Sequence, residues 1–351
     1  MSLSSTTYRR IELTGPGTLE LVTAQVRGRE RNGWALIAPR EVGVCRSDLK
    51  ELLGVREVRQ DFGHEIVADV VDCANAGRLE PGDVVTMDPH IPVTRSSGFA
   101  ELIELHGQPE MLDRALLRLS TTLASGHGIF VEPLACAARC VRRVHDALAT
   151  LTPPRGAIAI VGAGTFGVLI ASLVRAAGND VRLLNRSRAR LDFLEGKGIF
   201  SAPELRTLEC AQHQRFTSII LATTFAEPEL VTWCTEHADE ATLITIFGGT
   251  RDGMTVGDGG ADLDALRRRE ELREVRIGGR LFWLAGCHGA EREDFSRAMN
   301  TLEEDEQVRY TVAQLRGPEL SLPEAVQALP QYARSPTFGK PIVVPSQRGH
   351  A

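Results

Sequence analysis

The segment GAGTFG at residues 162–167 constrains the fold of this chain more than any other feature. An uninterrupted apolar run at 157–161 precedes it, as expected for a parallel strand that is buried on both faces. A segment with helical spacing follows over 165–177, and a second strand candidate, VRLLN, lies at 181–185. This order of strand, glycine-rich turn, helix and strand predicts a βαβ unit over residues 157–185.

The three glycines of the segment have separate functions in such a turn. Gly162 permits the tight bend, Gly164 lets a pyrophosphate approach the backbone, and Gly167 lets helix and strand pack closely. A helix that begins at Thr165 and Phe166 offers free N–H groups and the positive end of its dipole to phosphates. The unit is therefore predicted to bind a dinucleotide. The alternative is a glycine-rich turn of an α/β fold that has no such ligand.

The end of the second strand indicates which dinucleotide is bound. Asn185 and Arg186 stand where an acidic residue would accept hydrogen bonds from the ribose of NAD. Asn185 removes the charge that would repel a 2′-phosphate, and Arg186 can pair with that phosphate. Arg190 is a further candidate for binding the cofactor. The pattern favours NADP over NAD, although these arginines could also be surface helix residues of an arginine-rich protein.

Strands and helices alternate after residue 156. Strands are expected at 157–162, 181–185, 218–223 and 242–248, and helices at 165–177, 187–197 and 227–238. This alternation predicts an α/β fold with a doubly wound parallel sheet. Residues 1–100 instead contain short strands between Gly and Pro turns, for example at 19–26, 34–44, 64–72 and 83–89. A chain of 351 residues is long enough for two such domains.

Composition excludes several classes of protein. The net charge of −6 and the lack of a basic stripe argue against nucleic-acid binding. No apolar run is long enough to cross a membrane, and the first residues lack the apolar core of a signal peptide, so a cytoplasmic location is expected. The seven cysteines form no CxxC pair, and disulfides are not expected. Lysine occurs only at positions 50, 197 and 340, so each retained lysine carries more information than usual.

Three separated residues supply the ligand types of a catalytic zinc site. Cys45, His64 and Glu132 offer a thiolate, an imidazole and a carboxylate, which would leave a fourth position open. Their spacing is no recognisable metal motif by itself. Taken singly, Cys45 reads as a core residue, His64 as a buried histidine with satisfied hydrogen bonds, and Glu132 as a carboxylate at a helix N-terminus.

The chain resembles the medium-chain dehydrogenase/reductase superfamily in its motifs and their order. These motifs are GVCRSD, GHE, PGDVV, GFAEL, VEPLA and GAGTFG. The resemblance covers nearly the whole chain and is strongest to the zinc-dependent sorbitol, polyol and glucose dehydrogenase branches. It implies a GroES-like, mostly-β catalytic domain at residues 1–150, completed by 291–351. It also implies a Rossmann domain at 151–290.

By position, the resemblance assigns the residues of a metal site. It implies that Cys45, His64 and Glu132 are the zinc ligands, and that Glu65 is a carboxylate that can approach or replace a ligand. Asp48 matches the residue that orients the zinc-binding histidine.

The segment around Cys45 also matches substrate and cofactor positions of the family. Ser47 matches the hydroxyl that bonds the substrate alcohol, and Arg46 matches a position that often contacts the cofactor pyrophosphate. Lys50 stands where many members have the histidine that ends a proton relay. It could relay a proton only if its pKa were lowered toward neutrality, and a phosphate contact or plain exposure are equal alternatives.

The sequence departs from the family where many members hold a structural zinc. Residues 88–102 are short and lack cysteine, so one catalytic zinc and no structural zinc are expected. Asp88, His90, Arg95 and Ser96 replace the lost lobe and are expected to contact the substrate, although surface loops are often polar in any case.

The resemblance implies a function. It implies a zinc-dependent oxidoreductase that transfers hydride between NADP(H), or NAD(H), and a secondary alcohol or ketone of the polyol, sugar or cyclitol class. A homo-oligomer, in the first place a homodimer, is expected, with RLFWLAG at 280–286 as an edge strand. The alternatives are a zinc-independent reductase or lyase of the same fold, and a nucleotide-binding protein without turnover.

Overall fold

The computed structural model describes residues 6–28, 33–55, 61–151, 156–211, 214–335 and 337–346. The chain divides into two compact units. Unit 1 comprises Met1–Glu132, Met299–Asp305 and Leu315–Ala351, and unit 2 comprises Pro133–Ala298 and Glu306–Gln314.

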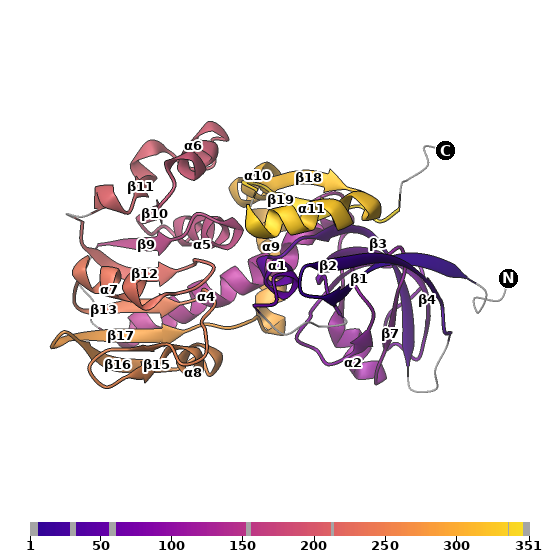
Figure 1. Cartoon of the computed structure of the whole chain (residues 1–351), viewed down its shortest axis with the longest axis horizontal. Helices are drawn as coiled ribbons and strands as arrows, with labels where there is room; N and C mark the ends of the chain where they lie inside the picture. The colour runs from indigo at the N-terminus through magenta and orange to yellow at the C-terminus, as the bar shows by residue number, and fades with distance from the viewer. Residues whose placement is uncertain are drawn as a thin grey trace. The chain divides into compact units, whose positions relative to one another are not determined.

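Unit 2 contains a seven-stranded sheet with the order β11-β10-β9-β12-β13-β17-β16. All neighbours in this sheet are parallel except β16 and β17. The strands are β9 (Ala157–Val161), β10 (Val181–Asn185), β11 (Leu205–Thr207), β12 (Phe216–Leu221), β13 (Ala238–Ile246), β16 (Leu272–Ile277) and β17 (Arg280–Gly286). The chain leaves β9 in one direction to β10 and β11, then returns to the other side of β9 at β12 (Figure 1). This reversal confirms the predicted doubly wound fold and places the glycine turn at the switch point.

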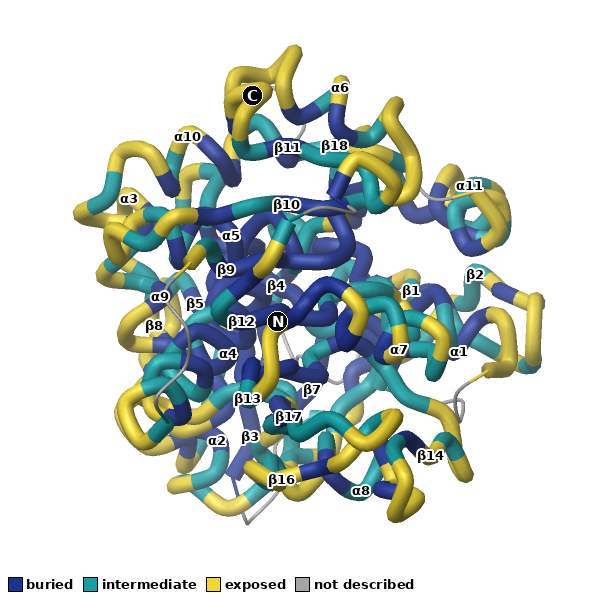
Figure 2. Tube along the Cα trace, turned by 90° about the vertical axis from the view of Figure 1, so that its left-hand side faces the viewer, coloured by how far each residue is buried: buried dark blue, intermediate teal, exposed yellow. Residues whose placement is uncertain are grey.

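Among the described residues, seven helices lie wholly or partly in unit 2. They are α4 (Val131–Thr150), α5 (Thr165–Ala176), α6 (Arg188–Gly196), α7 (Pro228–Glu236), α8 (Leu263–Arg268), α9 (Arg292–Glu304) and α10 (Glu306–Leu315), where α4, α9 and α10 extend past the limits of the unit. Short pieces complete it: η3 (Ala202–Glu204), η4 (Glu209–Ala211), β14 (Thr255–Val256) and β15 (Ala261–Asp262). Figure 2 shows that β9 and β12 are buried, whereas α6 has exposed outer turns.

The expectation that residues 280–286 form an edge strand is wrong. β17 pairs with β13 on one side and with β16 on the other, so β16 is the outer strand of this sheet among the described residues. Gly278 and Gly279, both with positive φ, connect β16 to β17 in a two-residue hairpin. Such hairpin turns need positive φ at both central residues, which glycine adopts without strain. The Gly-Gly pair is a hairpin signal that is visible in the sequence, and the expectation of an edge strand at 280–286 did not take it into account.

Most of α4 belongs to unit 2. Arg139 forms ion pairs with Glu270 and Glu291, and Arg142 pairs with Asp294 at 3.0 Å. These contacts join the helix to the segment before β16 and to the start of α9. The compact units therefore differ from the domain limits expected at residues 150 and 291, which stay a prediction.

Unit 1 is built on an eight-stranded sheet with a separate hairpin. The path is β18-β19-β3-β4-β5-β8, and β7 pairs with both β3 and β6. Its strands are β3 (Trp34–Gly43), β4 (Glu65–Ala74), β5 (Val84–Met87), β6 (Thr94–Arg95), β7 (Ile103–His106), β8 (Leu116–Arg118), β18 (Arg316–Leu320) and β19 (Lys340–Val343). The hairpin consists of β1 (Thr7–Gly15) and β2 (Thr18–Gln25), and the helical segments are α1 (Arg46–Leu52), α2 (Pro109–Ala115), α3 (Thr121–Ala124), η2 (Gly128–Phe130) and α11 (Leu322–Arg334).

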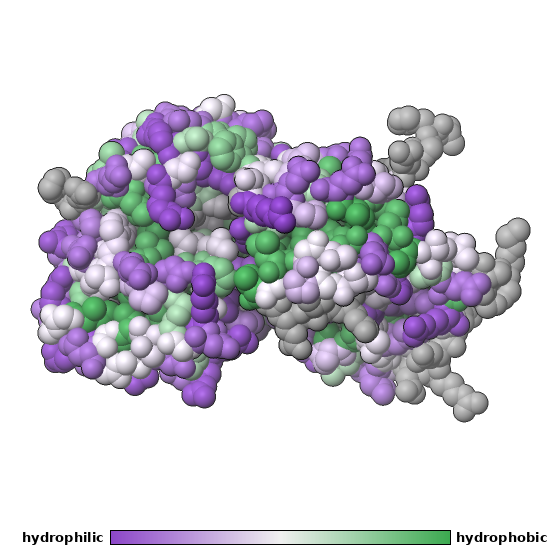
Figure 3. Space-filling model, in the orientation of Figure 1, coloured by the Kyte–Doolittle hydropathy of each residue, from purple (hydrophilic) through white to green (hydrophobic). Residues whose placement is uncertain are grey.

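The core of unit 1 joins segments that lie far apart in the sequence. Buried side chains of β3, β4, β7 and α11 form one hydrophobic cluster, which includes Trp34, Ile66, Leu105 and Leu329. Apolar side chains also gather on the surface over α11 and the β1–β2 hairpin (Figure 3). The C-terminal strand β19 pairs with β3, and this pairing brings residue 340 next to the segment that contains residue 45.

No helix among the described residues is long and apolar enough to cross a membrane.

Candidate functional site

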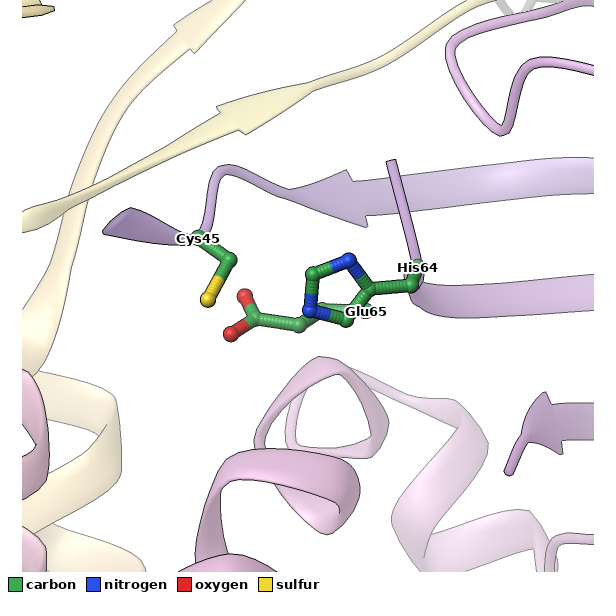
Figure 4. A group of neighbouring side chains, drawn as sticks. All are labelled: Cys45, His64 and Glu65. Carbon is green, nitrogen blue, oxygen red and sulfur yellow. The ribbon is translucent and has the colours of Figure 1, made fainter. Parts of the chain in front are cut away.

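A thiol, an imidazole and a carboxylate meet in unit 1. Cys45, His64 and Glu65 each offer one ligand atom, and these atoms lie within 4.8 Å of one another. Figure 4 shows the Glu65 carboxylate directed toward the sulfur of Cys45, with the His64 ring beside it. Cys45 is 5% exposed and Glu65 is fully buried. One soft sulfur ligand with one nitrogen and one oxygen ligand is a donor set that fits zinc.

Asp48 fixes the relative position of the two segments that carry this cluster. Its carboxylate accepts hydrogen bonds from the backbone N–H of Cys45 at 2.9 Å and of Gly63 at 3.2 Å. The Nδ1 atom of His64 lies 3.3 Å from the same carboxylate. Cys45 is the N-cap of α1, and an acidic residue at the third helical position commonly reaches back to the N-cap N–H. Asp48 is therefore placed to fix the ring orientation and tautomer of His64.

Glu65 reaches the cluster because of the register between strands. It lies opposite Gly43 in the β3–β4 pair, and a Cβ atom at Gly43 would lie 2.5 Å from Oε2 of Glu65. Glycine at position 43 thus makes room for the carboxylate. Oε2 forms a buried ion pair with Nζ of Lys340. Lys340 itself comes from β19, on the other side of β3.

The charges of the cluster shift one another. Burial raises the pKa of Cys45, and the neighbouring Glu65 adds to this effect. Burial disfavours the charged form of His64, but Asp48 and Cys45 outweigh it and raise the pKa of His64 well above its usual value. Burial also raises the pKa of Glu65, and Lys340 only partly offsets this. A divalent cation would stabilise the anionic forms of both Cys45 and Glu65.

The other residues predicted for this site lie at its edge or nearby. Glu132 is buried at the start of α4 and interacts electrostatically with Glu65, but it does not join the group within 4.8 Å. Its role as third ligand stays a prediction. Ser47 Oγ and Arg46 Nε are buried and have no hydrogen-bond partner among the described residues. Lys50 is half-buried on α1. The catalytic and cofactor roles of these residues also stay predictions.

The segment that replaces the structural-zinc lobe is tied into unit 1. The buried Asp88 accepts a hydrogen bond from the backbone N–H of His90 at 2.9 Å. The side chain of Arg95 is 4% exposed, lies 3.7 Å from Asp61 and donates to the carbonyl of Ser96. The expected substrate contacts of these four residues remain untested.

The glycine turn has the geometry that its sequence predicts. Gly162 has φ +109°, and a Cβ there would lie 2.9 Å from the carbonyl oxygen of Ala222. A Cβ at Gly167 would overlap the carbonyl oxygen of Gly162. Gly164 is the N-cap of α5, and a Cβ there would meet no atom within 4 Å. Gly162 and Gly167 are therefore required by packing, whereas Gly164 leaves space beside the helix N-terminus that begins at Thr165.

The polar side chains at the end of β10 and just after it have different hydrogen-bond and ion-pair partners. Oδ1 of Asn185 accepts a hydrogen bond from the N–H of Ala163 at 3.3 Å, so this side chain also supports the turn. Arg186 is exposed and has no acidic partner among the described residues, in contrast to Arg188, which pairs with Asp192 at 2.7 Å. Arg190 is partly buried, which lowers its pKa. Phe166 contacts the ring of Phe247, with ring centroids 5.3 Å apart.

Lys340 is the residue at the cluster that the sequence did not predict. The available signals were the scarcity of lysine and its place in the C-terminal strand GKPIVV. The pairing of β19 with β3 was not predictable from either.

Part of the chain matches a known protein family. Residues 31–146 match the model of the alcohol dehydrogenase GroES-like domain family. A comparison with curated protein sequences gives no significant match.

Three solved structures share the fold over nearly their full length. The first is 2R,3R-butanediol dehydrogenase from Bacillus subtilis, with a TM-score of 0.71 and 16% identity over 97% of this chain and 100% of that chain. The second is galactitol-1-phosphate dehydrogenase from Escherichia coli, with a TM-score of 0.72 and 16% identity over 96% of this chain and 100% of that chain. The third is a protein from Sinorhizobium meliloti that is bound to NADP and provisionally assigned as a zinc-binding dehydrogenase, with a TM-score of 0.71 and 19% identity over 97% of this chain and 100% of that chain. Residues 31–146 therefore contain an alcohol dehydrogenase GroES-like domain, and the chain as a whole has the fold of these three proteins.

Proposed function

We propose that the protein is a zinc-dependent dehydrogenase that transfers hydride between NADP(H) and a secondary alcohol or ketone. The observation that carries this proposal is the group of Cys45, His64 and Glu65, whose ligand atoms lie within 4.8 Å of one another. A sulfur, a nitrogen and an oxygen donor that converge on one point form a set that suits zinc.

In this proposal, residues of unit 1 have separate roles at the substrate. A zinc ion bound there supplies Lewis-acid polarisation of the substrate oxygen. Ser47 is the candidate to accept the proton of the substrate alcohol, and its buried Oγ, which has no hydrogen-bond partner among the described residues, supports this role. Asp48 holds the His64 ring in one orientation through its contact with Nδ1. Lys50, half-buried three residues after Ser47, is the candidate to pass the proton on.

The residues of unit 2 bind the cofactor in this proposal. A nicotinamide dinucleotide supplies the hydride chemistry itself. The N–H groups at the start of α5 and the open space at Gly164 suit its pyrophosphate. Arg186 is the candidate partner of a 2′-phosphate, because no acidic side chain of the described residues engages it. Arg46 and Arg190 are the further candidates for cofactor contacts.

A metal analysis combined with a substrate screen tests this function. The purified protein is expected to hold zinc at the catalytic site, and nicotinamide absorbance should change with polyols, sugars, cyclitols or the corresponding ketones. Absence of zinc with retained reduction would favour the zinc-independent reductase. Zinc without turnover of any substrate, but with dinucleotide binding, would favour a nucleotide-binding protein.

The polyol, sugar or cyclitol class is the proposed substrate class. It is supported by the fold shared with butanediol and galactitol-1-phosphate dehydrogenases. The homodimer also stays a prediction, and any joining of sheets would use β16 rather than β17.

A further inference from the structure

Lys340 lies buried beside a residue of the metal cluster. It is one of three lysines in the chain and is 3% exposed. Its ammonium group pairs with Oε2 of Glu65 and lies 3.5 Å from the carbonyl oxygen of Val44, the residue before Cys45. A charged lysine is seldom buried to this degree unless it is paired. Lys340 therefore has a position that is defined by Glu65 and by the backbone that leads to Cys45.

The two oxygens of Glu65 have different surroundings. Oε2 is taken by Lys340, whereas Oε1 is buried and has no hydrogen-bond partner among the described residues. The carboxylate lies within the group formed with Cys45 and His64 (Figure 4). An unsatisfied buried carboxylate oxygen is costly, so this arrangement points to a ligand for the group.

Two cations would compete for the same carboxylate. If Glu65 bound a metal permanently together with Cys45, His64 and Glu132, the four positions of a tetrahedral zinc would be filled and no position would remain for substrate. The ion pair with Lys340 holds Oε2 and balances its charge without the metal. The competition therefore decides whether the metal site is closed or open.

We propose that Lys340 is a positioning residue that restrains Glu65, so that this carboxylate remains a replaceable ligand and one coordination position stays open for the substrate oxygen. This inference rests on the proposed zinc function. Arginine at position 340 would hold both oxygens in a bidentate pair, and methionine would hold neither. Lys340→Arg should thus keep the restraint on Glu65, whereas Lys340→Met should remove it.

The full-length protein loaded with Co²⁺ tests the proposal, with azide as a probe of the open position. In the wild type, azide should change the visible absorption of the bound Co²⁺. Lys340→Met should bind Co²⁺ at least about tenfold more tightly and azide at least about tenfold more weakly, since Glu65 then occupies the open position. Lys340→Arg should keep azide binding, and so should the exposed control Lys197→Met.

A double variant shows whether the effect passes through Glu65. In Glu65→Gln/Lys340→Met, azide binding should return toward that of Glu65→Gln alone, because the competing carboxylate is gone. Unchanged azide binding in Lys340→Met would overturn the proposal. If the methionine variant does not fold, Lys340→Arg still tests it, because arginine keeps the charge, and loss of azide binding in that variant would also overturn the proposal. A wild type that binds neither Zn²⁺ nor Co²⁺ would overturn the zinc function as well, whereas the other two outcomes leave that function standing.

Discussion

The glycine turn of unit 2 and the cluster of Cys45, His64 and Glu65 in unit 1 are built in different ways. The turn is one segment of six residues. Its glycines let backbone atoms approach closely at Gly162 and Gly167 and leave open space at Gly164. The cluster uses side chains from the start of α1, the start of β4 and, through Lys340, the C-terminal strand β19. The turn is therefore specified by local sequence, whereas the cluster exists only after distant strands have paired.

This difference has a consequence for substitutions. A change at Gly162 or Gly167 of the turn should act on folding, because the backbone atoms that a Cβ would meet cannot move aside. A change in the cluster should act on metal affinity, because the strands that carry the side chains have cores of their own.

Gly167→Ala should have the largest effect on stability. The added Cβ would overlap the carbonyl oxygen of Gly162, which is fixed between β9 and α5. A loss of more than about 4 kcal/mol in the free energy of unfolding is expected. Denaturant unfolding measures it, with Gly164→Ala as control.

Gly164→Ala should separate folding from binding. Nothing lies within 4 Å of a Cβ at this position, so the variant should fold normally and bind NADP more weakly. If Gly167→Ala were as stable as this control, backbone packing would not be what requires glycine in the turn.

Arg139→Met should destabilise unit 2 without affecting the cluster. Its side chain is 10% exposed and pairs with Glu270, which is 17% exposed, so its removal should cost about 3 kcal/mol near neutral pH. The exposed pair of Arg297 with Glu293 offers a control, since Arg297→Met should change stability little. Weaker zinc binding in Arg139→Met would contradict the independence of the two regions.

The effect of Arg139→Met should also depend on pH. Burial opposes ionisation of Glu270, but Arg139 outweighs it and lowers the pKa of Glu270 below its usual 4.5. The stabilisation is therefore present above about pH 4.5 and is lost as the pH falls through the folded-state value. Wild type and variant should converge in stability in acid, and a constant difference down to low pH would count against the ion pair as its source.

Asp48→Asn should weaken zinc binding while the fold persists. Asparagine lacks the charge that faces His64 and has one acceptor oxygen for contacts that now use both carboxylate oxygens. A loss of about 10- to 100-fold in zinc affinity is expected, measured by competition with a chelator. Asp88→Asn is a matched control, since Asp88 is also a buried carboxylate near a histidine but lies outside the cluster.

The same contrast explains what could be predicted from sequence. The order of strands and helices in unit 2 and the roles of Gly162 and Gly167 follow from local patterns, and the structure has both. Cys45 and His64 were predicted to meet only through the resemblance, because no periodicity relates positions 45 and 64. Lys340 was missed because its contact depends on the pairing of β19 with β3, which joins segments about 300 residues apart. The error at 280–286 was different, since the Gly278–Gly279 hairpin was a local signal.

Arg186→Ala should have the smallest effect and act on cofactor choice alone. The side chain is exposed after β10, so its removal should leave folding and zinc binding unchanged. Loss of one charge-assisted contact should lower kcat/KM for NADP about tenfold and leave kcat/KM for NAD nearly unchanged. Arg188→Ala is the control, because Arg188 already pairs with Asp192. Equal losses with NADP in both variants would mean that general positive charge, rather than the side chain at position 186, selects the cofactor.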